Sequence, residues 1–99
     1  MDRNMQFRSI TDEMANLYDR KNSDYGNSFD RSIDQFGLVA SAVRLGDKYN
    51  RFSQLINANQ QVKDESIRDT LIDLANYAVM TILWLDEKGE VVNEESYRL

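Results

Sequence analysis

The chain has 99 residues, of which 41% are hydrophobic and 29% charged, and its formal net charge of −5 disfavours an extended nucleic-acid-binding surface. It contains neither cysteine nor histidine, which excludes disulfides, zinc–thiolate sites and Ser–His or Cys–His catalysis, and leaves carboxylates, Lys, Tyr or a metal for any chemistry. No apolar run approaches the roughly 18 residues of a membrane span and no signal peptide is evident, so we expect a cytoplasmic protein.

The first predicted helix covers about residues 4–21. An apolar stripe at helical spacing defines it, and its members are Ile10, Met14, Leu17 and Tyr18. In the segment that follows, KNSDYGNSFD at 21–30, residues 24–27 have the composition of a turn in which Gly26 can take a positive φ, and the rest leads toward a helix cap. Phe29 and Phe36 are interpreted as core side chains at the entry to the next helix.

A capping box, Ser32 to Gln35, predicts that the second helix covers about residues 33–58. Its predicted core stripe consists of Leu38, Ala42, Leu45, Tyr49, Phe52 and Ile56. Gly37 and Gly46 reduce the stability of this helix, which indicates close packing or a ligand near its backbone.

The third predicted helix covers about residues 65–87, with a predicted core stripe of Ile67, Leu71, Leu74, Ala78, Ile82 and Leu85. Its second half, YAVMTILWL, is apolar almost all round, and three helices of this size cannot cover it alone. We therefore predict a single all-α domain over 1–99, a three-helix antiparallel bundle that assembles as a homo-oligomer, with a short C-terminal tail at 88–99.

The third helix also carries an acidic ridge, because Glu65, Asp69, Asp73 and Asn76 follow one another at steps of four, four and three residues. Carboxylates at this spacing repel one another, and a divalent cation such as magnesium would relieve the repulsion. A solvated face, or salt bridges to a neighbouring helix, explains the same pattern.

The second helix supplies the opposite charge through a basic stripe, Arg44, Lys48 and Arg51, with Asp47 beside it. These cations could bind phosphate oxygens, or could pair with Asp47 and with the acidic ridge. Carboxylates that hold a metal opposite cations that hold phosphate would suit a nucleotide di- or triphosphate.

Three segments carry a family resemblance: D-Y-G-x-S-F at 24–29, V-R-L-x-D-K-x-N-R at 43–51 and D-E-S-x-x-D-T-L-x-D-L-A-N-Y at 64–77. Over about residues 18–85 the chain resembles the phage and bacterial family called nucleotide modification associated domain, type 1. The resemblance implies a role in nucleotide metabolism or base modification. The nucleotide-binding candidates are Asp24, Tyr25, Gly26, Asn27, Ser28, Arg44, Lys48, Arg51 and Asn76.

The third helix is also similar to the E-x-x-x-D helix of the all-α MazG-like nucleotide pyrophosphohydrolases, with Asp69 and Asp73 in the metal-ligand places. The second helix departs from that pattern because it lacks an E-x-x-E pair. The metal-ligand candidates are Asp47, Glu65, Asp69 and Asp73.

Three hypotheses remain open at this stage. The first is a nucleotide-binding protein, which could sequester a nucleotide signal of host defence without turnover. The second is a magnesium-dependent nucleoside triphosphate pyrophosphohydrolase. The third is a structural helical adaptor whose polar stripes form only interhelical salt bridges.

Overall fold

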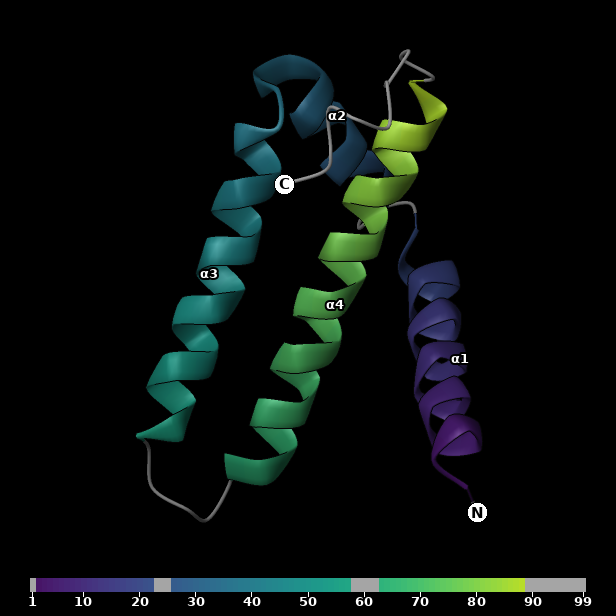
Figure 1. The fold of residues 1–99 in the computed structure, drawn as a ribbon. Coiled ribbons are helices and arrows are strands. Elements are labelled where there is room, and N and C mark those ends of the chain that lie inside the picture. The colour runs from purple at the N-terminus through teal and green to yellow at the C-terminus, as the bar shows by residue number, and fades with distance from the viewer. Residues whose placement is uncertain (1, 23–25, 58–62, 89–99) are drawn as a thin grey trace.

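The computed structural model describes residues 2–22, 26–57 and 63–88, with the backbone alone for 63–66, and its elements are all helices. They are α1 (Arg3–Lys21), α2 (Gly26–Phe36), α3 (Val39–Ile56) and α4 (Lys63–Glu87). Figure 1 shows α3 and α4 side by side and antiparallel, α2 across their upper ends, and α1 on the other side of α4. The all-α prediction is confirmed, and the predicted three-helix arrangement gives way to four helices. The predicted tail beyond residue 88 lies outside the described residues.

The predicted helix over 33–58 is in fact two helices, which meet at Gly37. The φ of Gly37 is 80°, in the left-handed region that favours glycine. Its N–H donates to the carbonyl of Ile33 at 2.7 Å, which ends α2, and its own carbonyl accepts from the N–H of Ala40 at 3.0 Å as α3 begins. The capping role predicted for Ser32 is therefore wrong, because Ser32 lies inside α2, where its Oγ donates to the carbonyl of Ser28 at 3.2 Å.

The helical conformation of α2 comes from burial rather than from local turn chemistry. Phe29 and Ile33 lie one turn apart and pack with Met80 of α4 in a small core, and the rings of Phe29 and Tyr77 lie 5.0 Å apart. This burial outweighs the turn composition of the segment, so the turn predicted over 24–27 is wrong for Gly26 and Asn27, and the helix begins before the predicted residue 33. The core role of Phe29 is confirmed, whereas Phe36, at the last position of α2, is 63% exposed.

Polar contacts join α2 to the C-terminal end of α4. Trp84 Nε1 donates to Asp34 Oδ1 at 2.9 Å, and Lys88 Nζ lies 3.0 Å from the same oxygen. The hydrogen bond from Trp84, followed by Lys88, lowers the pKa of Asp34 below its ordinary value. One turn earlier, burial raises the pKa of Asp30, with smaller contributions from the charges of Glu87 and Asp34.

The polar side of α4, and not its predicted core stripe, turns toward the rest of the chain. Thr70, Ile72 and Asn76 are buried, whereas Ile82 in the predicted stripe is 55% exposed. Leu71 and Ala78 of that stripe are exposed as well. The predicted stripe on α4 is therefore only partly a core within one chain, because its other members, Ile67, Leu74 and Leu85, are half-buried. None of the helices in the described ranges is long and apolar enough to cross a membrane.

The stripe predicted as core on α3 is likewise only partly covered. Leu45 and Phe52 are half-buried, Tyr49 and Ile56 are exposed, and Ser41, outside the stripe, is buried. The hydroxyls of Ser41 and Thr81 lie 2.6 Å apart between α3 and α4. Since the Thr81 hydroxyl donates its one hydrogen to the carbonyl of Tyr77, Ser41 is the donor of this pair.

The substitution Ile33→Ala tests the small core. Ile33 is 1% exposed, so removing its side chain leaves a cavity, and we expect the free energy of unfolding to fall by about 2–5 kcal/mol. The matched control is Ile10→Ala on α1, an exposed position where we expect a loss under about 1 kcal/mol. Urea unfolding followed by circular dichroism measures both values, and equal losses would contradict the assignment of the core.

Replacing Asp30 and Asp34 separately by Asn should change stability in opposite directions. The raised pKa of Asp30 means that its ionised form destabilises the folded state, so Asp30→Asn should raise the Tm at about pH 7. The lowered pKa of Asp34 means that its ionised form stabilises the folded state, so Asp34→Asn should lower the Tm.

Both differences should shrink as the pH falls. The Tm difference between Asp30→Asn and the wild type declines as the pH falls through the raised pKa of Asp30 in the folded protein. The Tm difference between Asp34→Asn and the wild type declines as the pH falls through the lowered pKa of Asp34 in the folded protein. Thermal melts of the three proteins between about pH 7 and pH 3 measure this. Shifts of the same sign in both variants would contradict the assignment.

Candidate functional site

The polar residues predicted as a site lie on one side of the α3–α4 pair. Arg44 and Arg51 are turned by about 40–60° around α3 from Lys48, which faces α4. Viewed along each helix from its N-terminus, Asp69 and Asn76 are rotated around α4 in the same direction, measured from the side of α4 that faces α3. Because the two helices run antiparallel, rotations in the same direction place the residues of both helices on the same side of the pair. Asn76 contacts α1, so this is the side on which α1 packs.

A cleft of about 420 Å³ lies between α1 and α4. Its lining residues are Glu13, Leu17, Arg20, Lys21, Asp69, Ile72 and Asp73. The α4 wall carries two carboxylates one turn apart, and the C-terminal turn of α1 contributes two cations. The cleft therefore combines both signs of charge within a volume that suits a small molecule.

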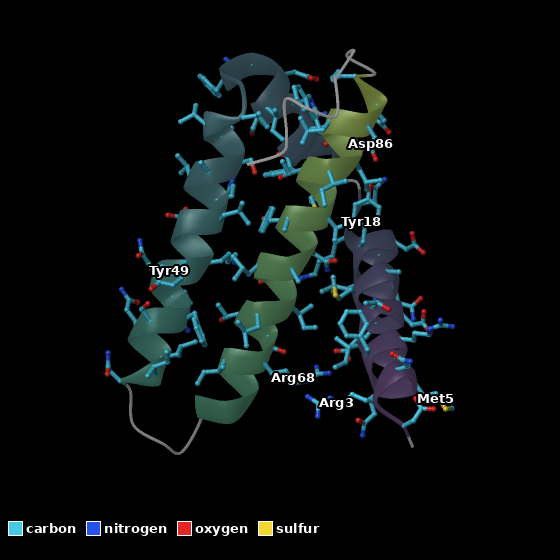
Figure 2. The ribbon with its side chains drawn as sticks, viewed as in Figure 1. Arg3, Met5, Tyr18, Tyr49, Arg68 and Asp86 are labelled. Atoms are coloured by element: carbon cyan, nitrogen blue, oxygen red, sulfur yellow. The ribbon has the colours of Figure 1, made fainter. Side chains whose placement is uncertain are left out.

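Polar contacts between α1 and α4 help to set the width of the cleft, since α1 has no buried residue of its own. Arg68 donates from both terminal nitrogens to the two carboxylate oxygens of Glu13, each at 2.7 Å, and Figure 2 shows it pointing toward α1. These hydrogen bonds lower the pKa of Glu13 and raise that of Arg68. Asn76, only 4% exposed, donates from Nδ2 to the carbonyl of Met14 at 3.3 Å.

The basic stripe meets the acidic ridge at one direct ion pair. Lys48 Nζ lies 3.2 Å from Asp73 Oδ2, and both side chains are half-buried. The same ammonium lies 6.0 Å from the centre of the Tyr77 ring. Arg44 and Arg51 are exposed, and within the described part of the chain neither has an ion-pair partner.

The predicted loop residues fall at the start of α2 or before it. Gly26 is the first residue of α2, and Asn27 and Ser28 are exposed in its first turn. Asp24 and Tyr25 lie outside the described residues. Their assignment to a nucleotide site stays a prediction.

The metal-ligand candidates are divided between two helices. Asp69 and Asp73 share the cleft wall, Asp47 is exposed on α3, and the side chain of Glu65 lies outside the described residues. Among the side chains that the structure describes, no group of three or more acidic residues is arranged to hold a metal ion.

The sequence analysis missed the contribution of α1 to the cleft. Glu13, Leu17 and Arg20 follow one another at steps of four and three, so they share one face of a helix. That spacing was available in the sequence.

Comparison with known proteins gives one family match. The model of the nucleotide modification associated domain 1 family matches residues 21–85, about two thirds of the chain. The chain belongs to this family. No curated protein and no solved structure matches it. The family match covers α2, α3 and nearly all of α4, and it begins at the last residue of α1, so most of the α1 wall of the cleft lies outside it.

A double-mutant cycle on Lys48 and Asp73 tests whether the observed pair contributes to stability. Lys48→Met keeps most of the apolar stem beside Tyr77 and removes the charge, and Asp73→Asn removes the other charge. We expect a coupling energy of about 0.5–1 kcal/mol in urea unfolding, because the pair is only partly shielded from water. Additive losses would show that the two charges do not interact in solution.

Proposed function

We propose that this protein binds a nucleotide or a nucleotide-derived small molecule in the cleft between α1 and α4. The observation that carries the proposal is the charge pattern of one side of the fold. Arg20 and Lys21 of α1 line a cleft of about 420 Å³ whose α4 wall holds Asp69 and Asp73, and Lys48 of α3 pairs with Asp73 at 3.2 Å. Membership of a nucleotide-linked family supports the same substrate class.

The residue types around the cleft suit the separate parts of a nucleotide. Arg20 in the cleft lining, and Arg44 and Arg51 exposed on α3, carry guanidinium groups, which donate paired hydrogen bonds to phosphate oxygens. Carboxylates accept hydrogen bonds from sugar hydroxyls or from the amino groups of a base. Lys48 partly neutralises Asp73, which reduces the repulsion between that carboxylate and a nearby phosphate.

Within this proposal the segment 24–29 forms the wall beside the base. Gly26, with no side chain, would let the backbone approach the ligand closely, and Tyr25 would offer a ring for stacking. Asp24 and Asn27 would supply hydrogen bonds at the same place. The family motif D-Y-G-x-S-F supports this role for the segment.

Binding without turnover is the form of the proposal that we favour. The chain has no histidine or cysteine, so the residues that serve most often as general base or thiol nucleophile are missing. A small phage protein of this kind could sequester a nucleotide signal of host defence.

A second candidate function is magnesium-dependent hydrolysis of a nucleoside triphosphate. It is favoured by the two carboxylates, Asp69 and Asp73, that share the cleft wall one turn apart. Magnesium is commonly held by one or two carboxylates together with phosphate oxygens of the substrate, so this donor set fits the ion. The bound ion would polarise a phosphoryl group, while Arg44 and Arg51 would orient the phosphates.

Isothermal titration of the purified protein tests the proposal, with a panel of ribo- and deoxynucleoside triphosphates, cyclic dinucleotides and ADP-ribose, each with and without magnesium. We expect at least one compound to bind, and we expect Arg44→Gln and Arg51→Gln each to weaken binding about tenfold, since each removes a charge-assisted contact to phosphate. The matched control is Arg31→Gln, which removes an exposed arginine of α2 and should leave affinity unchanged.

Analysis of the ligand after incubation separates the candidates. Intact ligand recovered from the denatured complex supports binding alone, and pyrophosphate released only with magnesium supports the enzyme. A folded protein that binds none of the panel at about millimolar concentration would contradict both and leave the helical adaptor.

A further inference from the structure

The α3–α4 pair has a second, apolar side opposite the polar one. Ser41 and Lys48 of α3, and Tyr77 and Thr81 of α4, lie between the two helices. The residue that follows each of them is apolar and is turned by about 100° from it. Because the helices are antiparallel, these following residues lie on one common side. With residues one or two turns away on the same side they form the apolar face, which comprises Leu38, Ala42, Gly46, Tyr49, Ile56, Leu71, Ala78 and Ile82.

The apolar face is exposed and carries no charge. Its five large side chains are between 40% and 59% exposed, the highest being Tyr49 and the lowest Leu71. Figure 2 shows Tyr49 on α3, with α4 between that helix and α1. Contiguous apolar surface of this kind marks an interaction site, and the absence of charged residues is typical of the centre of a protein interface.

Gly46 gives independent support for an occupant that approaches α3 closely. It lies in the middle of the helix, where glycine is less favourable than alanine. A Cβ added at this position would meet nothing within 4 Å, so packing within the chain does not require a glycine. With Ala42 one turn before it, Gly46 leaves a shallow strip on α3 into which a helix of another molecule can pack.

We propose that a second copy of this chain covers the apolar face, so that the two α3–α4 pairs form a four-helix bundle. The face extends along the whole of α3, 18 residues or about 27 Å, so the helix of a second copy can lie along it. An interface about a two-fold axis uses the same patch on both copies, and an uncharged apolar face meets its own copy without like-charge repulsion, although each chain carries a net charge of −5.

A membrane surface suits this face less well. The net charge of −5 opposes approach to the anionic lipids of most bacterial membranes. The cleft lies on the opposite side of the α3–α4 pair, so the dimer leaves the cleft of each copy open. The dimer proposal therefore stands independently of the proposed function.

Sedimentation equilibrium of the full chain, from about 1 to 200 µM, tests the dimer. We expect the wild-type mass to approach twice the 11.6 kDa of one chain. Ile82→Glu puts a carboxylate into the proposed interface and should raise the dissociation constant at least about a hundredfold. The matched control, Gln54→Glu, adds the same charge at an exposed site of α3 outside the apolar face and should have no effect.

Gly46→Ala distinguishes loss of association from loss of folding. In one chain the added methyl meets open space and favours the helix, whereas in the dimer it meets the partner and should raise the dissociation constant about tenfold. Circular dichroism shows whether each variant remains helical. A wild type that stays monomeric over the whole range, or an association that Ile82→Glu leaves unchanged, would overturn the proposal.

Discussion

The second half of α4 is apolar around most of its circumference, and the need to cover it organises the rest of the structure. α3 covers one side, α1 covers a second, and α2 packs against its upper part through the contacts of Phe29 and Ile33 with Met80. α3 packs most extensively against α4, whereas α2 is only 11 residues long and α1 has no buried residue. The third side of α4 remains exposed within one chain, and it is the most regularly apolar of the three.

The sides of α4 that are covered include its most polar residues, and hydrogen bonds make this arrangement stable. Thr81 accepts from Ser41 on α3, and Asn76 donates to the carbonyl of Met14 on α1. A buried polar group that keeps its hydrogen bonds costs little, whereas an apolar contact of the same shape would allow the helices to slide. These pairs therefore define which residues of the three helices lie opposite one another. The cleft lies next to these hydrogen-bonded pairs, where α4 carries the carboxylates Asp69 and Asp73.

The sequence was sufficient to predict helices where propensity and packing agree. The bounds of α1 and α4 fall within two residues of the predicted ones. It was not sufficient for α2, where the turn composition around Gly26 is outweighed by burial of Phe29. Periodicity also identified the apolar stripes of α3 and α4 correctly but could not say what covers them, since a stripe on a helix does not distinguish a core from an interface. The α1 wall of the cleft depends on contacts such as Glu13 with Arg68, which are 55 positions apart and form only when the helices dock.

The position of α1 has a further consequence for a ligand in the cleft. No residue of α1 is buried, and its strongest polar contact, between Glu13 and Arg68, is exposed to water and therefore contributes little to docking. A phosphate-bearing ligand that contacts Arg20 on α1 and the α4 wall together would add its own binding energy to that weak contact. Because the two equilibria are thermodynamically linked, an interaction that stabilises the docking of α1 on α4 would raise the affinity for the ligand. The bound ligand would stabilise the docking of α1 by the same free energy. The apolar face on the opposite side of the α3–α4 pair shares none of these residues, so the proposed assembly and the proposed ligand binding would use separate surfaces.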